Sequence, residues 1–190
     1  MQPVVCMITD RRRFGQHAEA ALIRRVALAA RSGIHLIQIR ERDMPDGALL
    51  TLVAQAVEAV RGTRARVLVN ARVDVAIAAG AHGVHLRGDS APATRVRAVA
   101  PLAFLIGRSV HSCDDVSQLC EEGGLDYLLF GSVFETASKP DQVAAGNDSL
   151  GAAVNAAKRL PVLAVGGVTL GTVSRVGPTC CSGFAGIGQF

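Results

Sequence analysis

The clearest fold signal in this chain lies in residues 106–112, Ile-Gly-Arg-Ser-Val-His-Ser, and in residues 126–136, Asp-Tyr-Leu-Leu-Phe-Gly-Ser-Val-Phe-Glu-Thr. Each stretch predicts a buried strand followed by a loop, because an apolar run stops abruptly at polar or glycine residues. The first stretch brings Ser109 and His111 to one end of its strand. A histidine titrates near neutral pH and a hydroxyl can donate a hydrogen bond, so this pair predicts the acid–base site of an enzyme.

The same alternation of strands and helices extends along all 190 residues. Segments 16–31 and 45–60, among others, carry apolar residues at helical spacing between the runs. Strands that are apolar on both faces need cover on both sides, which favours a parallel sheet. Eight such units without a linker predict one α/β domain, residues 1–190, folded as a (β/α)8 TIM barrel. The apolar runs lie at residues 4–8, 34–39, 67–69, 83–86, 103–106, 127–130, 162–165 and 184–187.

The sequence ends at Phe190, directly after the eighth apolar run. We therefore expect the last outer helix of the barrel to be absent or reduced. A neighbouring subunit could cover the strand that this helix would otherwise protect, so the pattern allows a homo-oligomer.

Composition narrows the class of partner. The net charge is +4, and aromatic residues do not alternate with the scattered basic ones, which argues against nucleic-acid binding. A mildly positive chain suits a phosphorylated small molecule, and the one basic run, residues 11–13, is typical of a solvated turn. The five cysteines lack metal-site spacing, and we see neither a signal peptide nor an apolar run of about 20 residues. We therefore expect a cytoplasmic protein with reduced thiols and no membrane contact.

Polar side chains follow the carboxyl ends of the predicted strands, where barrel enzymes place their active sites. Gln38 and Arg40 share one strand parity, so both can face the barrel interior. Arg40 has an alternative role as a rim ion-pair partner of Glu41 or Asp43. His85 lies inside an apolar run and has the alternative role of a hydrogen-bonded core histidine. The other candidates at these strand ends are Asn70, Ser109, His111 and Thr136.

Glycines follow or end the seventh and eighth strands, at Gly166, Gly167, Gly186 and Gly188. Glycine lets backbone N–H groups approach a phosphate closely, and barrels often bind phosphate after these two strands. We therefore predict that the backbone of these glycines and of Ile187 binds a phosphate, although tight turns alone would also explain them. Lys139 lies in the long loop that we expect after the sixth strand, residues 131–149. It could neutralise a ligand anion or lie at the surface.

Six segments together resemble the thiamine-phosphate synthase and thiazole tautomerase family. The resemblance spans the second to the seventh predicted strand and implies the same (β/α)8 fold. The synthase of this family joins a pyrimidine diphosphate to a thiazole phosphate with magnesium, whereas the tautomerase moves a proton on a thiazole carboxylate phosphate without a metal. The matching segments are residues 38–43 (Gln-Ile-Arg-Glu-Arg-Asp), 69–74 (Val-Asn-Ala-Arg-Val-Asp), 80–86 (Gly-Ala-His-Gly-Val-His-Leu), 106–112, 126–136 and 164–167 (Ala-Val-Gly-Gly).

The chain departs from the synthase pattern where the resemblance places the magnesium and diphosphate contacts. Arg42 stands where synthases usually have lysine, and Ala71 stands where they have aspartate. After His85, the acidic candidate that remains is Asp89. Magnesium prefers carboxylate and phosphate oxygens, so we expect no cofactor; if the chain is a synthase, we expect magnesium with Asp89 as a ligand.

In the tautomerase branch, the histidine at the position of His111 is linked to proton transfer. We therefore predict a thiazole tautomerase, an isomerase whose catalytic residues are His111 and Ser109 and whose substrate is a phosphorylated thiazole. Two alternatives stay open, the magnesium-dependent synthase, which is a transferase, and a barrel that binds a thiamine precursor without converting it. The expected substrate-binding residues are Gln38, Arg40, Arg42, Asn70, His85, Thr136 and Lys139.

Overall fold

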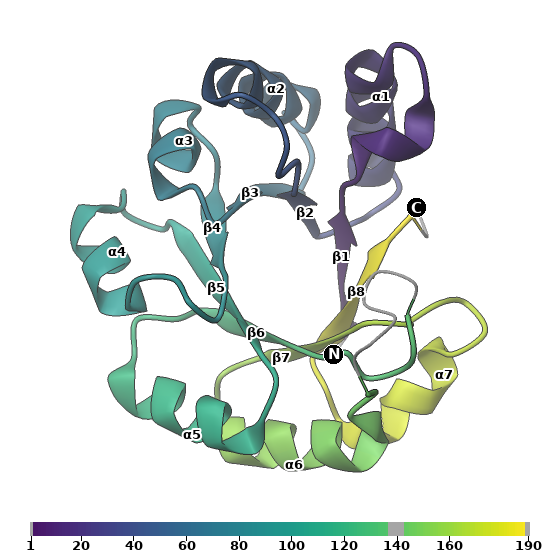
Figure 1. Ribbon diagram of the computed structural model, residues 1–190, viewed down its shortest axis with the longest axis vertical. Coiled ribbons are helices and arrows are strands. Elements are labelled where there is room, and N and C mark those ends of the chain that lie inside the picture. Colours follow the sequence, from purple (N-terminus) through teal and green to yellow (C-terminus); the bar gives the residue numbers. More distant parts are fainter. Residues whose placement is uncertain (1, 137–142, 189–190) are drawn as a thin grey trace.

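The computed structural model describes residues 2–136 and 143–188 and shows a closed barrel of eight parallel strands (Figure 1). Each strand pairs with its neighbours in the chain, and β1 closes the ring by pairing with β8. The predicted (β/α)8 barrel is therefore confirmed. The strands are β1 (Val4–Ile8), β2 (Leu36–Ile39), β3 (Arg66–Asn70), β4 (Gly83–Leu86), β5 (Leu105–Val110), β6 (Tyr127–Phe130), β7 (Val162–Val165) and β8 (Gly183–Ile187).

Helices surround the barrel and cover its outer face (Figure 1). β8 ends at Ile187, and the described residues end at Gly188. In the described ranges no helix has the length and apolarity needed to cross a bilayer. The helices are α1 (Ala18–Arg31), α2 (Asp46–Ala59), α3 (Val73–Ala78), α4 (Ala93–Val99), α5 (Cys113–Glu122), α6 (Gly146–Ala157) and α7 (Val173–Val176), with short 3-10 helices η1 (Arg11–Phe14) and η2 (Gly177–Thr179).

Several elements differ from their predicted bounds, most clearly the fifth strand and the loop after the sixth. The fifth strand was expected to end at residue 106, but β5 continues to Val110 and includes Ser109. Polar residues can extend this strand because one of its faces lines the barrel interior, where Ser109 finds a hydrogen-bond partner. The loop after β6 was expected to reach residue 149, but α6 already begins at Gly146.

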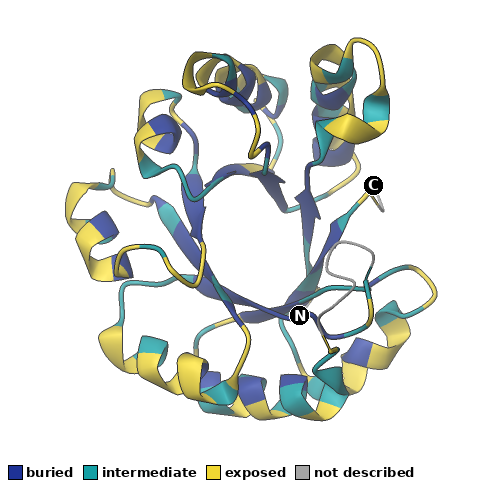
Figure 2. Ribbon diagram, viewed as in Figure 1, coloured by how far each residue is buried: buried dark blue, intermediate teal, exposed yellow. Residues whose placement is uncertain are grey.

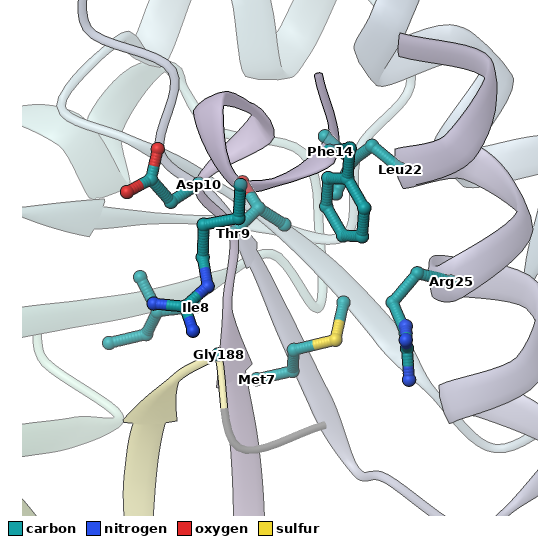
Figure 3. Close-up of a pocket in the computed structure, with 9 residues that line it drawn as sticks. Met7, Ile8, Thr9, Asp10, Phe14, Leu22, Arg25 and Gly188 are labelled. Atoms are coloured by element: carbon teal, nitrogen blue, oxygen red, sulfur yellow. The ribbon is translucent and has the colours of Figure 1, made fainter. Parts of the chain in front are cut away.

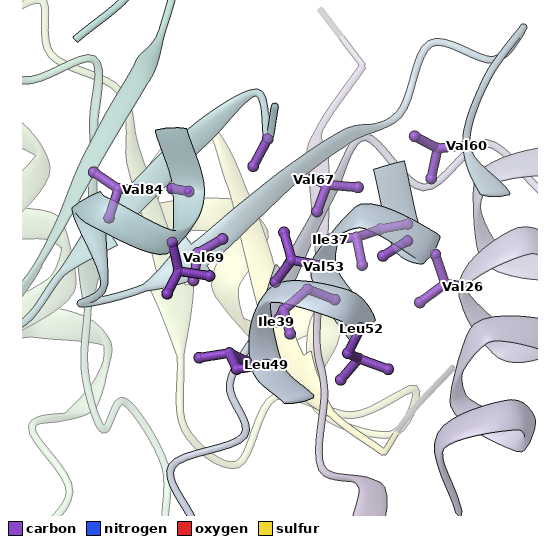
Figure 4. Close-up of a cluster of buried hydrophobic side chains, with 14 of the residues drawn as sticks. Val26, Ile37, Ile39, Leu49, Leu52, Val53, Val60, Val67, Val69 and Val84 are labelled. Atoms are coloured by element: carbon purple, nitrogen blue, oxygen red, sulfur yellow. The ribbon is translucent and has the colours of Figure 1, made fainter. Parts of the chain in front are cut away.

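The largest group of buried apolar side chains fills the space between the strands and the first four helices. Ile37 and Ile39 of β2 point outward into this layer, where they meet Leu52 and Val53 of α2 (Figure 4). Full burial of one such side chain stabilises the fold by about 1.5–3 kcal/mol. Figure 2 shows the result: the strands are buried, whereas the exposed residues lie on the outer sides of the helices and in loops.

Candidate active site

At the carboxyl ends of β2 and β3, two polar side chains form a hydrogen-bonded pair with a spare acceptor. Gln38 is 2% exposed, and its Nε2 donates to Oδ1 of Asn70 at 3.0 Å. Oε1 of Gln38 is buried and has no hydrogen-bond partner among the described residues. Because an unpaired buried acceptor is unfavourable, this oxygen is suited to accept a hydrogen bond from a bound ligand.

Inside the barrel, His85 of β4 lies between two hydroxyl groups. Its Nδ1 is 3.0 Å from the Tyr127 hydroxyl, and its Nε2 is 2.8 Å from Oγ of Ser109. The ring is 1% exposed, and burial, reinforced by the Arg108 cation, lowers the pKa of His85 to about 3. His85 is therefore neutral near pH 7, with one ring nitrogen donating and the other accepting. Since both nitrogens are engaged, the geometry fits the core-histidine alternative, and His85 reaches a ligand only through Ser109.

The low pKa of His85 predicts acid sensitivity of the fold. Below about pH 6.5 the unfolded chain binds a proton at His85 that the folded chain does not bind, so this group lowers stability as pH falls. Between about pH 7.5 and about pH 5.5, we expect wild type to lose about 1.4 kcal/mol more stability than His85→Gln. Urea unfolding of both proteins at the two pH values measures this difference. Equal losses would contradict a depressed pKa.

His111 follows β5 directly, and the start of α5 fixes its backbone. Ser112 caps this helix, because its Oγ accepts from the Asp115 N–H at 3.1 Å while the Asp115 carboxylate accepts from the Ser112 N–H at 3.2 Å. The exposed imidazole of His111 is held by a hydrogen bond from Nδ1 to the Gly131 carbonyl at the end of β6. A carbonyl only accepts, so Nδ1 carries the proton and Nε2 of the neutral ring is the basic nitrogen.

Gly131, which holds His111, is also packed against the end of β7. A Cβ at Gly131 would lie 2.1 Å from the Val165 carbonyl oxygen, and a Cβ at Gly166 would lie 2.6 Å from Cα of Ser132. The Phe134 N–H donates to the Gly166 carbonyl at 3.0 Å. The segment after β6 therefore contacts the His111 ring on one side and the first predicted phosphate turn on the other.

Three glycines at this end of the barrel have left-handed backbone conformations. Gly166 and Gly167, after β7, have φ of +91° and +65°, and Gly188, after β8, has φ of +71°. Gly186 and Ile187, which the sequence assigned to the phosphate turn, lie within β8 and pair with β1. The turn after the eighth strand thus begins at Gly188, the second of the two glycines predicted there.

The two arginines after β2 remain available to a ligand. The rim carboxylates predicted as alternative partners of Arg40 are bound by Arg11 instead, whose guanidinium is 3.3 Å from Glu41 and 2.6 Å from Asp43. Arg40 is half-buried, and its burial lowers the pKa of its guanidinium, as does the nearby cation of Arg42. Neither arginine has a carboxylate partner in the ranges that the structure describes.

The described residues provide no preformed magnesium site. In residues 2–136 and 143–188, no group of three or more His, Cys, Asp or Glu side chains could hold a metal. The Asp89 side chain is 68% exposed and forms an ion pair with Arg87 at 2.6 Å, and Asp10 is paired with Arg12 at 2.8 Å. Magnesium is held by carboxylates together with substrate phosphates. Here Asp89 and Asp10 are paired with arginines, and Ala71 supplies no carboxylate.

Three further residues complete the comparison with the sequence prediction. Thr136 lies in the described segment after β6 and is partly exposed, whereas Lys139 falls outside the described residues. Tyr127 was missed, because an aromatic residue in an apolar strand indicates core. Tyr127 and Leu129 are two residues apart in one strand, so both face the barrel interior. This alternation could have predicted that Tyr127 lies on the same side of the sheet as His85.

Polar side chains and glycine turns at the carboxyl ends of a closed parallel barrel define a (β/α)8 enzyme site. The family model described as thiamine monophosphate synthase matches residues 5–190. This chain belongs to the thiamine-phosphate synthase family, which confirms the predicted family and the prediction of a barrel enzyme of thiamine biosynthesis.

Individual relatives agree with this assignment. Thiamine-phosphate synthase from Roseiflexus castenholzii is 36% identical over 173 residues, which cover 91% of this chain and 74% of the relative. The enzyme of the same name from Chlorobium luteolum is 33% identical over 189 residues, covering 97% and 82%. A solved structure of thiamine phosphate pyrophosphorylase from Pyrococcus furiosus has a TM-score of 0.84 at 30% identity, covering 97% and 85%. These names support the synthase alternative better than the tautomerase prediction.

Proposed function

We propose that this protein binds a thiazole phosphate at the carboxyl end of its barrel and moves a proton on the thiazole ring without a metal. One observation carries the proposal: the Gly131 carbonyl fixes the His111 ring so that Nε2 is its basic nitrogen. A general base of this kind accepts a proton from one ring atom and, as the conjugate acid, returns a proton to another. Substrate and product then contain the same atoms, and only a proton and the ring double bonds change position.

Other polar groups at the strand ends suit the rest of such a substrate. The Oε1 of Gln38 can accept a hydrogen bond, and the Ser109 hydroxyl, supported by neutral His85, can donate or accept one. The guanidinium groups of Arg40 and Arg42 supply positive charge for a carboxylate. The glycine turns after β7 and β8 suit a phosphate.

A second candidate is the synthase reaction, which the names of the relatives favour. In that case the chain joins a pyrimidine diphosphate to a thiazole phosphate in the presence of magnesium, and pyrophosphate leaves as the new bond forms. Arg42 and Asp89 would have to replace the lysine and aspartate of the usual pattern, although Asp89 is now ion-paired with Arg87. The carboxylate chemistry of this site therefore supports the tautomerase reaction more strongly than the synthase reaction.

Incubation with each set of substrates, with magnesium and with a chelator, separates the two candidates. Mass spectrometry detects joined product and pyrophosphate, and proton NMR in deuterated water detects exchange at the thiazole ring. We expect exchange and isomerisation of the thiazole carboxylate phosphate with the chelator present. Magnesium-dependent pyrophosphate release without isomerisation would replace the proposal with the synthase, and binding without either product would contradict both.

A further inference from the structure

The basic run at residues 11–13, which the sequence suggested to be a solvated turn, forms the 3-10 helix η1 beside the end of β1. Two of its three cations are bound to carboxylates. Arg11 pairs with Glu41 and Asp43, and Arg12 pairs with Asp10 at 2.8 Å. Arg13 is exposed and has no such partner in the described part of the chain.

The guanidinium of Arg13 lies directly on the backbone after β8. A Cβ at Gly188 would be 2.3 Å from Cζ and 2.6 Å from Nε of Arg13, so a side chain at this position would displace the cation. The positive φ of Gly188 also favours glycine. Because β8 pairs with β7, this places Arg13 at the strand end adjacent to the one that carries Gly166 and Gly167.

Arg13 and Gly188 share a cavity of about 290 Å³ with a second arginine. Arg25 reaches toward it from α1, across from Gly188, while Phe14 and Leu22 form an apolar wall (Figure 3). The carboxylate that lines the cavity, Asp10, is already neutralised by Arg12. The cavity therefore has an excess of positive charge and suits an anion.

We propose that Arg13 binds the substrate phosphate from the β8 side, opposite the backbone of the turn after β7. A planar guanidinium can donate two parallel hydrogen bonds to phosphate oxygens, which backbone N–H groups in separate turns do not provide. Arg13 thus selects phosphorylated over unphosphorylated thiazoles. This inference rests on the proposed function for the identity of the substrate, but the anion site itself does not.

Inorganic phosphate tests the anion site directly. We expect Arg13→Ala to weaken phosphate binding by about 10- to 100-fold in calorimetric titrations. The loss of a hydrogen bond to a charged group commonly raises a dissociation constant by about that factor. The phosphate affinity of Arg13→Lys should lie between those of wild type and Arg13→Ala, because lysine keeps the positive charge but lacks the two parallel donors of the guanidinium. The control is Arg24→Ala, which removes one exposed cation of α1 that does not line the cavity.

In turnover assays, Arg13→Ala should raise KM with little change in kcat, because the phosphate is remote from the reacting ring atoms. Undetectable phosphate binding by wild type, or equal binding by wild type and Arg13→Ala, would overturn the inference. Turnover that depends on His111 but not on Arg13 would reject this inference alone. Phosphate binding that depends on Arg13 in a protein without isomerase activity would reject the proposed function alone.

Discussion

Replacing His111 with glutamine should lower the rate of thiazole isomerisation by about 100- to 10,000-fold, the usual contribution of a general acid–base group. Glutamine can still donate a hydrogen bond to the Gly131 carbonyl, which holds the wild-type ring. It cannot accept and return a proton at neutral pH, so the loss should appear in kcat. Single-turnover measurements of both proteins with the same thiazole phosphate provide the comparison.

Two controls separate proton transfer from disturbance of the fold. His17→Gln changes an exposed histidine at the start of α1 and should leave kcat unchanged. Calorimetry should show that His111→Gln binds a thiazole phosphate within a few-fold of wild type, because the proposed phosphate site lies on other elements. Wild-type turnover in His111→Gln would show that His111 is not the general base. A loss of ligand binding together with a lower kcat would indicate that His111 has a structural role instead.

Much of the fold could be predicted from the sequence because its signal is local. Short apolar runs that alternate with amphipathic segments require a parallel sheet with cover on both faces, and eight of them close a barrel. The inward direction of Gln38 followed from strand parity, and the structure places it in the barrel beside Asn70. The bounds of β5 could not be predicted in this way, since Ser109 is polar and its partner is 24 residues away.

The parts of the site that the sequence did not reveal depend on distant contacts. Tyr127 looked like a core residue because its sequence neighbours give no sign of a polar partner. That partner is His85, 42 residues earlier, whose Nδ1 forms a hydrogen bond with the Tyr127 hydroxyl. Arg13 looked solvated because Gly188 approaches it only when β8 closes the barrel against β1. The lack of a carboxylate at Ala71 could be read from the sequence without any structure, because it concerns a single position.

The turn after β7 provides the second large expected effect, through Gly167→Ala. At a φ of +65°, alanine is disfavoured by about 1–2 kcal/mol relative to glycine. The new Cβ would also lie 2.4 Å from the Glu135 carbonyl oxygen and 2.7 Å from Cβ of Phe134. Phe134 cannot shift freely, because its N–H is bonded to Gly166 and its ring lies 4.6 Å below the guanidinium of Arg175.

We therefore expect the turn itself to move, and two measurements should change together in Gly167→Ala. The free energy of unfolding should fall by about 1–3 kcal/mol, which lowers Tm by roughly 2–4 °C for each kcal/mol. Phosphate affinity should fall by about tenfold or more, because a shift of the backbone N–H groups removes charge-assisted hydrogen bonds. Gly171→Ala is the matched control in the same loop, since its Cβ would meet only Thr169 Oγ1 at 3.7 Å. If Gly167→Ala lost stability but kept wild-type phosphate affinity, the turn after β7 would be a structural feature alone, and the phosphate would have to bind elsewhere.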